Sequence, residues 1–231
     1  MSLSPEEWTT ILLSLRVALL ATVICFPVGL GLAWLLARKE FWGKSILNSL
    51  IHLPLVLPPV VTGYLLLVAF GKRGIIGAFL ENTFGLVFAF RWTGAALAAA
   101  LMALPLMVRA IRLSIESIDQ RLEGAAATLG ASPLRVFATV TLPLAAPGML
   151  AGTILTYVKA LGEFGATITF VSNIPGQTQT LSLSIYSLLQ TPDGDAAALR
   201  LILLSIDLAL AALLASELLA KRLTSRMVGK P

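Results

Sequence analysis

The sequence predicts an all-α integral membrane protein, a bundle of five transmembrane helices with one long hydrophilic loop between the third and fourth. Of its 231 residues, 57% are hydrophobic and 13% are charged, about half the charged share of about 25% that is typical of a soluble domain. So few charges cannot cover the surface of a soluble domain, which argues against a water-soluble enzyme. Long uncharged runs give the number of spans, and we take them in chain order.

The first three spans are expected at residues 12–37, 46–70 and 86–108. Residues 17–37 carry no charge, and at 1.5 Å per residue they reach about 31 Å, enough to cross the hydrocarbon core. Pro54, Pro58 and Pro59 lie in the middle of the second run and predict a kinked or broken helix. The third run contains Arg91 near its start and ends in an alanine-rich stretch that allows close helix packing.

The fourth and fifth spans are expected at residues 147–171 and 199–219. The fourth contains Lys159 and Glu163 near its centre, and the fifth contains Asp207. Gly148 and Gly152 match a G-x-x-x-G pattern, which predicts contact with a neighbouring helix of the same chain more readily than dimerisation. A sixth span, formed if the first 37 residues cross twice, is the alternative count, although 37 residues barely suffice for it.

The distribution of basic residues predicts that the N-terminus is outside and the C-terminus is cytoplasmic. With this orientation the cytoplasmic segments hold eleven of the seventeen basic residues, namely Arg38, Lys39, Lys44, Arg109, Arg112, Arg121, Arg135, Lys221, Arg222, Arg226 and Lys230. The exterior holds four, Lys72, Arg73, Arg91 and Arg200. This bias follows the positive-inside rule and accounts for the net charge of +5 without nucleic acid as a partner.

The hydrophilic loop at residues 109–141 has clear helix punctuation. Asp119 is expected to N-cap a short helix over residues 120–129, and Gly130 suits the left-handed position that ends it. Ser132 and Pro133 then match the N-cap and first position of a second helix. The first helix carries four consecutive small residues (Gly124, Ala125, Ala126 and Ala127), which favour close approach of another protein's surface.

This loop resembles the coupling loop in permease subunits of binding-protein-dependent ABC importers. Gly130, nine further residues and then Val140-Thr141-Leu142-Pro143 reproduce the G-x9-[I/V]-x-L-P end of that loop. Residues 122–129 are similar to its start, except that the pattern's glutamate falls on Gly124, with Glu123 one place earlier. The resemblance implies that Glu123, Gly124, Ala125, Ala126, Ala127, Gly130, Leu142 and Pro143 form the segment that couples to a cytoplasmic ATPase.

Two other segments, residues 52–61 and the run from Leu161 to Gly176, are similar to molybdate permeases of the type I ABC importers. Sulfate permeases are similar in the Gly162–Gly165 region but are generally longer. The resemblance implies a subunit of the inner membrane that works as a homodimer with two ABC ATPase subunits and an external molybdate-binding protein. It implies no cofactor on this chain, since ATP and Mg are used by the partner. Sulfate and tungstate stay open as alternative cargoes.

Lys159 and Glu163 are the main candidates for the translocation path. They are four residues apart on one helix face, and a lone charge at the centre of a bilayer costs about 2.5–3.5 kcal/mol, so we expect them to face the bundle interior. A structural ion pair is the alternative interpretation. The resemblance favours the path or its gate, and it extends that role to Phe164, Gly165 and Thr167. Residues 172–190 have leucines at helical spacing, which predicts either an outer amphipathic helix at the mouth of the path or a re-entrant connector.

Two other function classes are less compatible with the sequence. A membrane-embedded enzyme needs a nucleophile, a metal cluster or an acid/base pair, and one cysteine (Cys25) and one histidine (His52) offer no Cys/His metal cluster. We therefore expect no catalytic or metal-binding residue. A structural membrane scaffold gives no reason for the spacing of the coupling loop.

Overall fold

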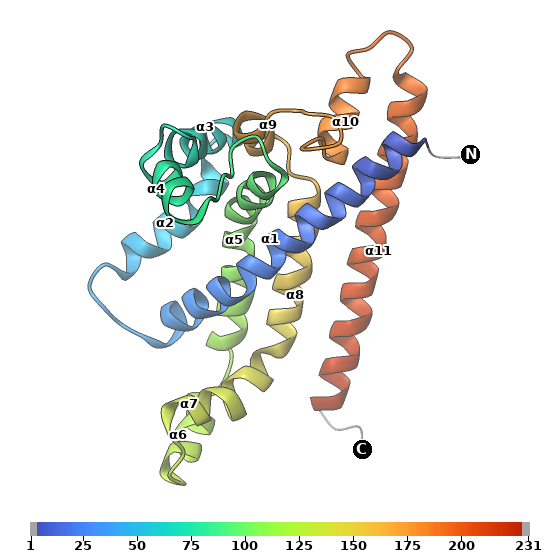
Figure 1. Ribbon diagram of the computed structural model, residues 1–231. Coiled ribbons are helices and arrows are strands. Elements are labelled where there is room, and N and C mark those ends of the chain that lie inside the picture. The colour runs from blue at the N-terminus through green and yellow to red at the C-terminus, as the bar shows by residue number, and fades with distance from the viewer. Residues whose placement is uncertain (1–3, 228–231) are drawn as a thin grey trace.

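A computed structural model describes the backbone of residues 4–227 and the side chains of residues 4–215, 217 and 218 (Figure 1). Every regular element within these residues is a helix, which confirms the predicted all-α class. Four helical stretches are long and apolar enough to cross a membrane, and a bent pair of helices makes up to a fifth. The arrangement therefore agrees with five crossings.

The first crossing is a single helix, α1 (Pro5–Arg38), of 34 residues. Ser4 and Glu7 form a capping box at its start, in which the Glu7 N–H donates to Ser4 Oγ at 3.1 Å and the Ser4 N–H donates to Glu7 Oε2 at 2.7 Å. This cap, with Pro5 in the first turn, starts the helix earlier than residue 12. Because α1 is continuous, the alternative of two short crossings in the first 37 residues is wrong.

The proline-rich second run is broken, as predicted. Helix α2 (Lys44–Val56) and α3 (Pro59–Phe70) meet at an angle of 113°. Pro58 and Pro59 have no N–H to donate to the preceding turn, so the helix cannot continue through them. A short helix, α4 (Ile75–Phe84), follows α3 and leads to the third crossing.

The centre of the bundle is α5 (Trp92–Glu116), which packs against α1 and α8. Its alanines are buried and allow the helices to approach closely; they are Ala95, Ala96, Ala98, Ala99, Ala100 and Ala103. A Cβ built on Gly148 of α8 would lie 2.2 Å from Ser114 Cβ, and one on Gly152 would lie 3.2 Å from Ala110 Cβ. The G-x-x-x-G pattern therefore marks contact within the chain, as predicted.

After α5 the chain forms α6 (Gln120–Thr128), α7 (Pro133–Val136), a π-helical turn η1 (Phe137–Thr141) and α8 (Leu142–Leu161). The fourth crossing differs from the expected range. It spans residues Pro133–Leu161 and ends ten residues before 171, so Lys159 lies in its last turn and not near its centre. Gly162 ends α8, and a new helix, α9 (Gly165–Val171), begins after it.

The last two helices are α10 (Leu181–Leu188) and α11 (Asp195–Met227). The first of these confirms the helix predicted from the leucine spacing. Figure 1 shows α6 and α7 at one end of the bundle, and α9 and α10 at the opposite end. We call these the α6 end and the α10 end.

Candidate functional site

The loop between α5 and α8 adopts the local structure that its sequence predicts. Asp119 caps α6 by accepting the N–H of Arg121 at 2.9 Å, and Gly130 has a φ of +84° just after the helix. Ser132 then accepts the N–H of Arg135 at 3.4 Å, with Pro133 in the first turn of α7. The caps end and restart the helix, so the loop projects from the bundle as a compact pair of short helices.

The small residues of α6 are available to a partner. No residue of α6 is buried, and Gly124, Ala125 and Ala127 are exposed. A Cβ on Gly124 would meet nothing within 4 Å. Leu122 and Leu129 at the same end are 51% and 89% exposed. An exposed patch of apolar and small side chains outside the spans is typical of a protein interface.

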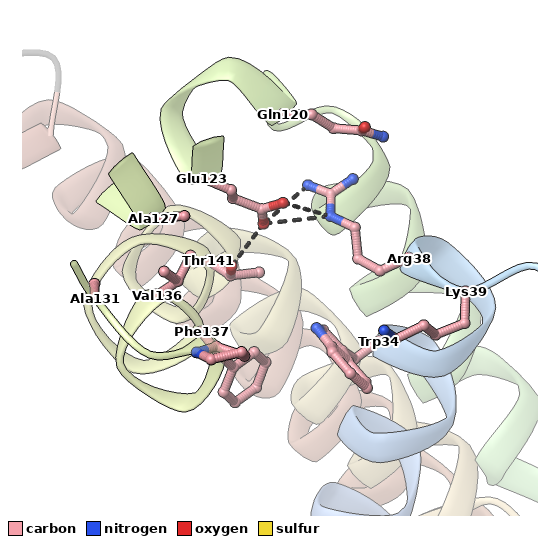
Figure 2. A pocket seen from close by; sticks show the side chains of 11 residues that line it. Trp34, Arg38, Lys39, Gln120, Glu123, Ala127, Ala131, Val136, Phe137 and Thr141 are labelled. Carbon is pink, nitrogen blue, oxygen red and sulfur yellow. Dashed lines mark hydrogen bonds and ion pairs between the residues drawn. The ribbon is translucent and has the colours of Figure 1, made fainter. Parts of the chain in front are cut away.

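Glu123 differs from its neighbours on α6 because its carboxylate points inward. Arg38, at the end of α1, lies with Nε 3.0 Å from Glu123 Oε2 and donates from Nη2 to Oε1 at 3.2 Å (Figure 2). The hydroxyl of Thr141 in η1 donates to the same Oε1 at 2.6 Å. One carboxylate thus joins α1, α6 and the π-helical turn.

These residues line a hollow of about 340 Å³ at the α6 end. Figure 2 shows Glu123 and Arg38 facing each other on one side of it, with Trp34 and Phe137 on the other. The two rings are 6.0 Å apart in an edge-to-face arrangement. The end of α1 therefore contacts the loop through one polar and one aromatic pair.

Leu142 and Pro143, the end of the recognised pattern, lie where η1 gives way to α8. Leu142 is half-buried and Pro143 is exposed in the first turn of the helix. The residues before Pro143 are also helical, so this proline lies within a continuous helical stretch and cannot donate a hydrogen bond to the preceding turn. The pattern thus marks the start of α8 within the fourth crossing.

At the α10 end, Lys159 and Glu163 form an ion pair, with Lys159 Nζ 2.8 Å from Glu163 Oε2. The Glu163 side chain is 3% exposed, and its other oxygen accepts the N–H of Ala166 at 3.2 Å. The Lys159 side chain is 34% exposed. Glu163 therefore has a structural role at the start of α9, while Lys159 is the accessible member of the pair.

The neighbouring candidates lie around the same break. The ring of Phe164 is 5.0 Å from that of Tyr186 in α10. A Cβ on Gly165 would lie 2.7 Å from Pro59 Cβ, so this glycine allows α9 to meet the start of α3. Thr167 is 1% exposed. The structure brings Lys159, Glu163, Phe164 and Gly165 together, and it places Thr167 in the packed interior.

The two groups of residues lie at opposite ends of the bundle and are joined by α8. This helix has 20 residues, a length of about 30 Å at 1.5 Å per residue. It begins beside Thr141 and ends beside Lys159. A displacement of the α6 end therefore has a direct helical connection to the α8–α9 break.

The sequence did not identify Arg38, Trp34 or Thr141 as functional residues. In the sequence, Arg38 contributes only to the cytoplasmic positive charge, and Thr141 occupies the variable position of the Val140-Thr141-Leu142-Pro143 pattern. Their contacts join residues 85 and 18 positions apart, a separation that local patterns do not reveal. One feature of the sequence does point to Arg38. It ends the first uncharged run on the cytoplasmic side of the membrane, where the loop is also expected.

Residues 27–225 match the family model described as "Binding-protein-dependent transport system inner membrane component". The chain is 58% identical over 221 residues to the molybdenum transport system permease protein ModB of Escherichia coli (strain K12), covering 96% of both chains. It is 35% identical over 227 residues to the sulfate transport system permease protein CysT of Salmonella typhimurium, covering 98% of this chain and 81% of that one.

A solved structure has the same fold at low identity. It is the crystal structure of a bacterial alginate ABC transporter in complex with an alginate pentasaccharide-bound periplasmic protein, matched with a TM-score of 0.72 and 19% identity. The match covers 97% of this chain and 80% of that one. The family match also confirms the expectation of a transport subunit and not an enzyme. The chain belongs to the family of binding-protein-dependent transport system inner membrane components.

Proposed function

We propose that this chain is the membrane-spanning permease subunit of an ABC importer for molybdate. The observation that carries the proposal is the 58% identity to a molybdenum permease over 96% of both chains. The identity to the sulfate permease is lower, at 35%. Sulfate is therefore the second candidate cargo, and tungstate is the third because it is an oxyanion of the same shape and charge as molybdate.

The α6 end is the cytoplasmic end in this proposal, and the start of α1 lies outside. Eleven of the seventeen basic residues then lie on the cytoplasmic side, as the positive-inside rule requires. Two copies of an ABC ATPase bind there, against the exposed small residues of α6, and they use ATP and Mg. A molybdate-binding protein docks at the α10 end, as the related alginate transporter binds a periplasmic protein.

A homodimer is supported by the exposed face of α11. Asp207 is exposed and has apolar neighbours on the same face, with Leu203 at 54% and Leu210 at 52% exposure. It lies twelve residues after Asp195, about 18 Å along the helix. A carboxylate facing lipid at that depth costs about 2.5–3.5 kcal/mol. A second copy of the chain that brings a polar or basic group to this carboxylate would lower the cost.

The mechanism is alternating access. ATP binding brings the two ATPase subunits together, and α6 carries this motion to the bundle, which rocks from an inward-open to an outward-open arrangement. The binding protein then releases its anion into the cavity, and hydrolysis restores the inward-open state. The chain needs two packed arrangements of similar energy and no reactive group.

Lys159, Glu163, Phe164, Gly165 and Thr167 are assigned to the path or its gate. The exposure of Lys159 supports a direct role, because an oxyanion path needs donors and positive potential without a deep cationic trap. The pairing of Lys159 with Glu163 reduces its charge and fits weak, reversible contact. Phe164, Gly165 and Thr167 position the break between α8 and α9.

Molybdate-dependent ATP hydrolysis tests the proposal. The permease, its ATPase and its binding protein are reconstituted in liposomes, and hydrolysis is measured with molybdate, sulfate and tungstate in turn. Stimulation by molybdate and not by sulfate supports the proposal. Equal or stronger stimulation by sulfate assigns the second cargo, and no stimulation by any oxyanion rejects the oxyanion class.

A further inference from the structure

The coupling helix α6 has few attachments to the rest of the protein. It has nine residues and none is buried, and a helix of this length is unstable in isolation. Among the described side chains, each hydrogen bond or ion pair that joins α6 to another helix is made by Glu123. Asp119 caps the start of α6 and Gly130 follows its end, but neither residue attaches α6 to another helix.

The attachment at Glu123 is well formed. Both oxygens of its carboxylate contact Arg38, and the Arg38 and Glu123 side chains are only 9% and 18% exposed. A paired guanidinium and carboxylate fix orientation as well as distance, and shielding from water strengthens the interaction. Arg38 also donates to the carbonyl of Ile118 at 3.4 Å, just before α6. The contact is therefore more than an exposed surface pair, which typically contributes little.

The same carboxylate reaches the start of α8 through the hydroxyl of Thr141 (Figure 2). Thr141 is 2% exposed and is the last residue of the π-helical turn. Such turns often occur at functional sites because they add a residue to a helix at a local cost. Here the turn precedes α8, the helix that leads to Lys159. Glu123 thus connects α6 with both α1 and α8.

We propose that Arg38, Glu123 and Thr141 form a clamp that makes α6, the end of α1 and the start of α8 move as one body. This rests on the proposed transport function and adds to it the residues that transmit the motion. Glu123 is then a positioning residue whose carboxylate is committed to the permease and is not the contact with the ATPase. Displacement of α6 reaches the bundle by two routes, along α1 and along α8, both of which pack on α5.

The alternative is that the ion pair only keeps the loop folded. The two interpretations predict different results when one member of the ion pair is neutralised and when the two charges are exchanged. A clamp predicts that α6 stays helical and binds the ATPase but no longer moves with α1. A folding role predicts that loss of the pair prevents assembly with the ATPase.

The functional test compares Arg38→Ala, Glu123→Gln and the charge exchange R38E/E123R in the reconstituted complex. We expect each single variant to copurify with the ATPase and hydrolyse ATP, with molybdate uptake per ATP reduced about tenfold or more. The exchange variant is expected to recover at least half of the wild-type ratio. Lys44→Ala is the matched control, because it breaks an exposed pair with Glu40 at the same end, 2.6 Å apart, outside the clamp.

A distance measurement tests the clamp without transport. Spin labels are placed at the exposed positions Lys39 and Thr128 by substitution with cysteine, and the distance distribution is measured in the purified permease. The wild-type sequence should give one narrow distribution, Arg38→Ala a broad one, and R38E/E123R a narrow one again. The native Cys25 is buried and does not compete for the label.

Several outcomes overturn the clamp. Normal uptake per ATP in Arg38→Ala and Glu123→Gln would do so, as would an equally narrow distance distribution in wild type and Arg38→Ala. Loss of assembly in the single variants without recovery in the exchange variant supports the folding role instead. If the wild-type complex transports no oxyanion, the proposed function fails, and the distance distributions alone decide whether the clamp exists.

Discussion

At the scale of residues, two glutamates connect segments that local sequence does not connect. Glu123 joins α6 to α1 and α8, and Glu163 joins the end of α8 to the first turn of α9. Each carboxylate contacts its partners through both oxygens, so each limits the relative movement of its helices. The sequence predicted the Lys159–Glu163 pair from its spacing of four residues. It could not predict that Glu163 also accepts the N–H of Ala166 in the first turn of α9, because local sequence does not mark the break after Leu161.

Neutralising Lys159 tests its place in the path. We expect Lys159→Ala to reduce molybdate uptake while the permease still assembles with its ATPase, because the anion loses the accessible donor at the α8–α9 break. Uptake by proteoliposomes and copurification measure the two effects. Lys72→Ala is the control, since Lys72 is exposed and forms only a 3.9 Å pair with Glu81.

The loss of Lys159 also leaves the buried Glu163 without its counter-charge, which by itself destabilises the protein. The double variant K159M/E163Q separates the two effects because it removes both charges and keeps similar side-chain volumes. Normal uptake by the double variant would mean that the pair is structural and that Lys159 is outside the path.

At the scale of elements, the sequence predicted most of the helices and the proline break between α2 and α3, but it did not predict the break after Leu161 or the π-helical turn. Uncharged runs gave the crossings, and caps at Asp119 and Ser132 gave the short helices of the loop, because these signals are local. The end of α8 at Leu161 coincides with Gly162 and with the hydrogen bond from the Ala166 N–H to Glu163. The π-helical turn over Phe137–Thr141 lies just before Pro143. Neither was visible as a change in hydropathy.

The packing of α8 on α5 gives a stability prediction. A Cβ at Gly148 would lie 2.2 Å from Ser114 Cβ, so Gly148→Ala must displace one of the helices. We expect a loss of about 1–3 kcal/mol of stability, typical of overpacking, measured as lower resistance to denaturant in detergent. Gly124→Ala is the control, since its Cβ meets nothing within 4 Å and alanine favours the helix. Equal stability of the Gly148 variant and wild type would contradict the close packing.

At the scale of the whole molecule, the proposed topology puts the α6 end and the α10 end on opposite sides of the membrane. The distribution of basic residues favours the α6 end as the cytoplasmic one. Single cysteines at Thr128 and Gln190, both exposed, test this with a membrane-impermeant maleimide in spheroplasts. We expect Gln190→Cys to react in intact spheroplasts and Thr128→Cys to react only after lysis. Reaction of both before lysis would contradict the arrangement.

The most direct test of the central claim is molybdate accumulation in sealed vesicles that contain the permease and its ATPase. ATP is enclosed inside, and molybdate with its binding protein is added outside. Complexes oriented with the α6 end inward should concentrate molybdate in the lumen above its external level, and sulfate in excess should not compete. No accumulation with ATP enclosed, or preferential accumulation of sulfate, would contradict the account.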